Sequence, residues 1–211
     1  MAKDLLYIHP RIYETAIKSG INALNTHTIY HPITTTGALL WGEIVGTFRR
    51  TVIKNNVTWR TEFRNGLSLL VNVDMNCTIV VSSGNAATGL AETHPCTQNT
   101  KGSATYNYVG HNYELWDISD KNCEDTHKTY IFLYHLDRNK NEIRYELGMP
   151  MQARICGRRG KIQIHRWQSR VIFEPIATHV GESQEDYQQR VLMPKLKPSL
   201  RYRGALRDLN L

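Results

Sequence analysis

Acidic residues are scarce in the last third of this 211-residue chain. Residues 154–170 contain six cations and no Asp or Glu, and residues 190–211 contain six cations and one acid, Asp208. The two segments together carry +11, whereas the whole chain carries +7, so the other residues sum to −4. Charge segregated in this way creates a field that attracts a polyanion or an acidic protein surface.

Long apolar runs are also missing. The first residues contain no signal-peptide apolar stretch and no small-residue cleavage site, and no apolar run approaches the length that spans a bilayer. We therefore expect a cytoplasmic protein without a membrane partner. Only four cysteines are present, and in a reducing compartment they are thiols or metal ligands before they are disulfides. Their positions are Cys77, Cys96, Cys123 and Cys156.

The chain nevertheless has enough bulky residues for a core, with 11 Tyr, 4 Trp and 4 Phe. Its length predicts one globular domain over 1–180, followed at 181–211 by a short helix and an extended basic tail. Ser183 with Asp186 resembles a capping box for that helix, which would end near Leu192, and Pro194 and Pro198 then break regular structure.

The first third of the chain has helical periodicity. A short strand is predicted at 5–8, then a helix that begins at Pro10 and ends near Leu24, and a second helix that begins near Thr34 and ends near Arg50. The predicted apolar faces are Ile12, Tyr13, Ala16, Ile17, Ile21 and Leu24 in the first helix, and Leu40, Trp41, Ile44, Val45 and Phe48 in the second.

The period changes to two after residue 56. Alternating runs at 57–63 and 67–73 flank Asn65-Gly66, the strongest short-range signal for a β-hairpin. Further strands are predicted at 78–81, 130–136, 142–147, 151–155, 162–164 and 171–173, with a long loop rich in small residues over 82–112. The fold class is therefore α+β, with N-terminal helices followed by a mainly antiparallel, meander-like sheet.

Two pairs of His and Cys have the residue types of a zinc site. His94 and Cys96 form one close pair, and Cys123 and His127 form another. Zinc is usually held by four N or S ligands delivered as two such pairs, so these residues are candidates for a structural zinc ion. The one-residue gap in the first pair is tighter than usual, and ordinary thiols with loop histidines remain the alternative.

A second reading of the same region is catalytic. His111 and His127, with Asn112 and Asn122 between them, resemble the arrangement in which a metal-dependent nuclease activates water with one His and holds a divalent ion with the other polar groups. The alternative is a solvated acidic loop.

The basic segment 154–170 is predicted to be a hairpin that turns at 157–160. With Met151, Ala153, Ile155, Ile162 and Ile164 inward, the polar face would carry Gln152, Arg154, Lys161, Gln163 and His165. The candidate nucleic-acid-binding residues are Arg154, Arg158, Arg159, Lys161, Arg166, Trp167 and Arg170 in the hairpin, and Arg201 and Arg203 in the tail. Cations neutralise phosphates, and Trp stacks on bases.

Three functions remain open from the sequence. The first is a basic protein that binds DNA or RNA through this hairpin and tail. The second is the metal-dependent nuclease. The third is an inhibitor or interaction protein, of the type found in phages and mobile elements, that docks on an acidic face of a nucleic-acid-processing machine. The sequence therefore leaves open whether the protein is an enzyme.

Overall fold

The computed structural model of the protein describes residues 6–28, 30–32, 34–110, 112, 127–156 and 161–178. Contacts divide the chain into two units, Met1–Val180 and Gly181–Leu211. All described residues belong to the first unit, so the predicted helix at 183–192 and the basic tail lie outside them.

Two helices precede the sheet, as predicted. Helix α1 (Pro10–Leu24) has Pro10 in its first turn, and the His9 ring accepts the N–H of Arg11 at 3.2 Å. Helix α2 (Thr35–Asn55) follows, and nearly all the predicted inward residues of both helices are buried. The exception is Trp41, which is 41% exposed. The predicted strand at 5–8 is wrong in its described part, because Leu6 and Ile8 are buried but lie outside any strand.

The remaining elements form a mostly antiparallel sheet. Its strands are β1 (Trp59–Arg64), β2 (Leu67–Asn72), β3 (Cys77–Ser83), β4 (Lys128–Asp137), β5 (Glu142–Ile155), β6 (Ile162–Ile172) and β7 (Ile176–Ala177). The order is β1-β2-β3-β4-β5-β6, and β7 pairs with the start of β5. Asn65 and Gly66 both have positive φ, +50° and +79°, as a type I′ hairpin requires.

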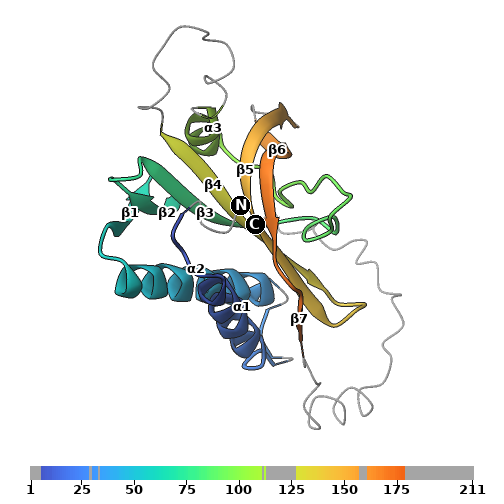
Figure 1. The fold of residues 1–211 in the computed structure, drawn as a ribbon. Helices are drawn as coiled ribbons and strands as arrows, with labels where there is room; N and C mark the ends of the chain where they lie inside the picture. The colour runs from blue at the N-terminus through green and yellow to red at the C-terminus, as the bar shows by residue number, and fades with distance from the viewer. Residues whose placement is uncertain are drawn as a thin grey trace, which may run out of the picture. The chain divides into compact units, whose positions relative to one another are not determined.

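One neighbouring pair departs from the antiparallel pattern. Strands β3 and β4 run parallel, so the chain between them must cross from one end of the sheet to the other. This crossover contains helix α3 (Ser103–Gly110), where the sequence predicted a long loop with local structure but no particular helix. Figure 1 shows α3 near the start of β4, well separated from α1 and α2.

The sheet buries both of its faces, because successive residues of a strand point to opposite sides. Phe132 packs with the residues of α1 and α2 in the larger core. Its neighbours Ile131 and Leu133 pack on the other face with Val109 of α3 and Ile164 of β6. The crossover therefore covers the face opposite the first two helices, and it does so beside the basic hairpin.

Candidate nucleic-acid interface

The hairpin formed by β5 and β6 is irregular in its middle. Pairing of β4 with β5 reaches only Ile131 and Gly148, and the β5–β6 register shifts at Met149, Pro150 and Gln152. Proline has no N–H to donate to a ladder, so within a sheet it is found at edges and bulges. Beyond Pro150 the hairpin continues as a two-stranded extension, which we call the basic arm (residues 151–156 and 161–167).

A buried asparagine holds the base of the arm. The Asn112 side-chain amide donates to the carbonyl oxygens of Thr129 and Pro150 at 2.8 and 3.1 Å, and its oxygen accepts the Thr129 N–H at 2.9 Å. Asn112 is 1% exposed and takes the place of a peptide group where β4 and β5 part. Asn112 therefore has a structural role in the described chain. The nuclease hypothesis had included it among the polar groups around a metal ion.

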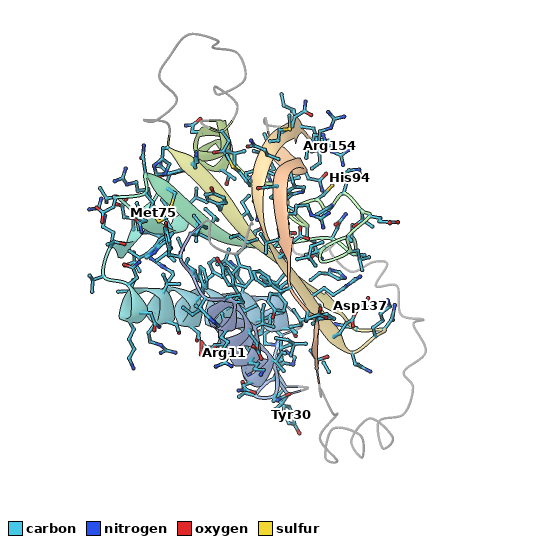
Figure 2. The ribbon with its side chains drawn as sticks, in the orientation of Figure 1. Arg11, Tyr30, Met75, His94, Asp137 and Arg154 are labelled. Atoms are coloured by element: carbon cyan, nitrogen blue, oxygen red, sulfur yellow. The ribbon has the colours of Figure 1, made fainter. Side chains whose placement is uncertain are left out.

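Three cations of the arm face solvent. Arg154, Lys161 and Arg166 are exposed, and none forms an ion pair with a residue that the structure describes. Figure 2 shows Arg154 at the far end of the arm. No Asp or Glu occurs anywhere between Glu146 and Glu174, so this surface has no acidic neighbour along the chain. The turn residues Arg158 and Arg159 lie outside the described ranges.

The predicted alternation of the arm is correct only in part. Ile162 and Ile164 are buried, whereas Met151 is 38% and Ile155 77% exposed. The bulge at Pro150 breaks the strict alternation at Met151, whereas Ile155 is exposed although it pairs with the buried Ile162 at the end of β5. On the polar face, Gln163 and His165 are only half-exposed.

The Gln163 side chain is half-buried because the crossover runs along the free edge of β6. Thr97 and Ile164 are joined by two hydrogen bonds, and Lys101 and Ile162 by two more. Gln163 donates to the Thr97 carbonyl at 3.0 Å, and its own oxygen accepts two bonds from the Arg154 guanidinium, at 2.6 and 3.2 Å. The crossover therefore fixes Gln163, and Gln163 fixes Arg154. Nothing local in the sequence marks Thr97, because it lies 67 residues before Ile164.

Trp167 and Arg170 are engaged inside the protein. The Trp167 indole donates to the Pro95 carbonyl at 2.7 Å, and its ring lies so close to Gly148 that an added Cβ would come within 2.6 Å of it. Arg170 binds the Glu146 carboxylate and the carbonyls of Leu90 and Thr93. Both residues hold the segment 84–102 against the sheet, so the exposed candidates in the described arm reduce to Arg154, Lys161 and Arg166.

The small-residue loop after β3 also has an internal partner. The Gly89 N–H donates to the Glu146 carboxylate at 3.0 Å. Gly89 has φ of +73°, and a Cβ there would meet Arg144 at 2.7 Å, so only glycine fits. The anion that this backbone N–H binds is therefore a carboxylate of the same chain.

The described members of the proposed zinc quartet lie apart. Cys96 lies beyond the carboxyl end of β3, where its N–H binds Asn85, and His127 lies before the amino end, where it contacts Asn76. The seven residues of β3 between these ends span roughly 20 Å at about 3.3 Å per residue, ten times a zinc–ligand bond. Figure 2 likewise shows His94 far from Met75, the neighbour of Asn76. Cys123 lies outside the described residues, among which no group of three potential ligands converges.

His127 is held by two hydrogen bonds. Nε2 lies 2.7 Å from the Thr78 hydroxyl, and Nδ1 lies 2.9 Å from the Asn76 side-chain oxygen. The imidazole also lines a 230 Å³ cavity with Arg60 and Tyr108. Both ring nitrogens thus contact residues in β3 or directly before it. His111, the other predicted catalytic residue, is outside the described part, as are Arg201 and Arg203.

The described cysteines form no disulfide with one another. Cys77 is buried, and Cys96 and Cys156 are half-buried. Burial raises the pKa of the Cys77 thiol to about 12. Cys77 is therefore an inert core residue at neutral pH.

Comparison of the chain with protein-family models, with curated protein sequences and with solved structures finds no match. Within the described residues, no helix has the length and apolar character needed to cross a membrane.

Proposed function

We propose that this protein binds nucleic acid through the basic arm, with Arg154, Lys161 and Arg166 as phosphate contacts. The observation that carries the proposal is that these three cations are exposed and form no ion pair within the described residues, whereas Arg144 and Arg170 of the same sheet, which are far less exposed, are paired. Phosphate contacts of this kind bind a nucleic-acid backbone without reading its sequence.

The position of Arg154 supports the same function. Its guanidinium uses Nε and Nη2 to bind Gln163, which leaves Nη1 and the outer N–H groups for a ligand. A side chain that is already held in place loses less entropy on binding than a mobile one. The arm therefore presents a partly preorganised cation rather than a freely rotating one.

A salt titration tests the proposal. Binding of labelled single-stranded DNA, single-stranded RNA and duplex DNA is measured by fluorescence anisotropy from low to physiological salt. Because bound phosphates release counterions, affinity should fall steeply with salt. The triple variant Arg154→Gln, Lys161→Gln, Arg166→Gln should lower the log–log slope for a single strand by about 2.

The matched control removes the same charge elsewhere. Arg11, Lys54 and Lys140 are exposed cations on α1, on α2 and in the β4–β5 turn, and replacing all three with Gln keeps the net charge equal to that of the arm variant. The control should bind nearly as the parent does. The proposal is wrong if the parent protein binds none of the three nucleic acids at low salt, or if both triple variants lose affinity equally. Binding to an acidic protein without binding to nucleic acid would favour the interaction protein instead.

A further inference from the structure

A second candidate site is a cavity whose lining contains none of the exposed cations Arg154, Lys161 and Arg166 of the basic arm. It has a volume of about 680 Å³ and is bounded by the first turns of α2, the start of β2, the carboxyl ends of β3 and β4, and the segment 98–105. Small-molecule sites in proteins typically have volumes of roughly 300–1,000 Å³. The volume of this cavity is therefore within the range of sites that bind small molecules.

The cavity exists because the sheet opens at one point. Pairing between β2 and β3 ends at Leu69 and Val80, whereas β3 continues beside β4 as far as Ser83 and Tyr134. The last three residues of β3 therefore have no β2 partner. Trp41 of α2 donates its indole N–H to the Val81 carbonyl at 3.3 Å, at this unpaired edge. The opening also lies at the carboxyl ends of a parallel strand pair, where α/β sheets bind ligands.

The charge of the cavity wall has one sign. Among the residues that the structure describes, the lining contains Lys101, His135 and Arg138 and no Asp or Glu. Both backbone groups of Lys101 are bonded to Ile162, so the residue is fixed in place. Its amine makes no hydrogen bond or ion pair within the described chain. Burial also lowers the pKa of Lys101. An unpaired, partly buried amine favours an anion as its partner.

The rest of the lining suits a flat ring. Trp41 is 41% exposed although it belongs to the otherwise buried face of α2, and its N–H is already bound to Val81. The exposed part of its ring is therefore available for stacking, and Leu40, Leu67 and Ile131 supply apolar walls. Hydroxyl groups of Ser83 and Thr105 add donors.

We propose that this cavity binds a small organic anion in which a flat conjugated ring carries a phosphate or carboxylate group. The anionic group pairs with the Lys101 amine, and the ring stacks on Trp41. The cavity lining includes Ile164 of the basic arm but none of Arg154, Lys161 and Arg166. The triple variant of these three cations should therefore bind the anion with unchanged affinity.

Isothermal titration calorimetry with matched probes tests the site. Adenosine monophosphate is compared with adenosine, and 2-naphthoate with 2-naphthamide. At least one anion should bind with a Kd below about 1 mM, and its neutral counterpart should bind at least about tenfold more weakly. Which anion binds distinguishes a phosphate ligand from a carboxylate ligand. The proposal is overturned if neither anion binds at 10-fold higher concentration (about 10 mM) or if the neutral probes bind equally well.

Variants of two residues locate the ligand. Lys101→Met should weaken binding of the anion by about 10- to 100-fold, the loss expected for one hydrogen bond to a charged group. Lys161→Met removes an exposed cation that precedes Ile162, the bridge partner of Lys101, but does not line the cavity, and it should leave the affinity unchanged. Trp41→Leu should cost about tenfold, and Trp41→Phe, which keeps a flat ring, should cost less. Unchanged affinity in a folded Lys101→Met protein contradicts the proposal.

Discussion

Arg170 and Glu146 form a buried ion pair across β5 and β6, with Nη2 and Nε of the arginine 2.5 and 3.2 Å from the carboxylate oxygens. Glu146 is 0% exposed, and the Gly89 N–H binds the same carboxylate. The pair thus joins the strand pair to the crossover that covers it. A buried ion pair whose groups are hydrogen-bonded in this way contributes little net stability. A buried Glu146 carboxylate without its arginine would, however, be strongly unfavourable.

Replacing Arg170 alone should therefore strongly destabilise the folded protein. We expect Arg170→Met to lower the free energy of unfolding by about 3–5 kcal/mol, measured by urea denaturation. The double variant Arg170→Met, Glu146→Leu should recover most of that loss, since no charge then stays buried. Lys18→Met, which breaks the exposed pair with Glu14, should change stability by less than about 0.5 kcal/mol. Equal effects of the two single variants would contradict this account.

Replacing Asn112 tests its role at the base of the arm. Asn112→Ala leaves the Thr129 N–H and two carbonyl groups without their partner in a buried place. The expected loss is about 3 kcal/mol in the free energy of unfolding. Asn139→Ala in the exposed β4–β5 turn is the matched control and should change stability little. Hydrogen exchange at the Thr129 amide would show whether the loss is local. Unchanged protection of this amide would contradict the role of Asn112 in linking β4 to β5.

Alanine substitutions at two glycines of α1 and α2 should change stability in opposite directions. A Cβ on Gly20 would come within 2.7 Å of Ile44 and 2.9 Å of Leu40, whereas a Cβ on Gly46 would meet nothing within 4 Å. Gly20→Ala should therefore destabilise by about 1–3 kcal/mol through overpacking. Gly46→Ala should stabilise by about 0.5–1 kcal/mol, because alanine is the better helix former. Thermal melts of the two variants give the signs directly, and two shifts in the same direction would refute the close crossing.

Lys101 should make stability depend on pH in the alkaline range. Its pKa is lowered by burial in the folded protein, so the unfolded chain binds its proton more tightly. Its destabilising effect is complete below the folded pKa and disappears as the pH rises through the folded pKa towards the unfolded value. Lys101→Met should thus be more stable than the parent at pH 7, and the difference should shrink by pH 10. A gap in denaturant midpoints that is constant from pH 7 to 10 would exclude this desolvation effect.

Local patterns predicted the local parts of this fold. The inward faces of α1 and α2 follow from helical spacing, and the Asn65-Gly66 turn follows from the positive φ that both positions need. The antiparallel pairing around residues 137–141 follows from alternation on either side of a turn.

The parts that the sequence did not reveal depend on contacts between distant residues. The parallel pairing of β3 with β4 joins strands separated by the crossover, and no local period encodes it. The role of Arg170 was also hidden. In the sequence it is one cation of a basic run, whereas in the structure it forms an ion pair with Glu146. Pro150 was a usable signal, because a proline inside a predicted strand indicates a bulge, and the bulge explains why Met151 is exposed.

The crossover also constrains the order in which a growing chain can complete its structure. Segment 84–102 is made early in synthesis, but it is held by Ile162, Ile164, Trp167 and Arg170, which follow some 60 to 80 residues later. Until Arg170 leaves the ribosome, closing this segment over the sheet would bury the Glu146 carboxylate without its cation, which is unfavourable. We therefore expect the segment to stay accessible to proteases in ribosome-bound chains that end before β6, and to become protected only when that strand is added.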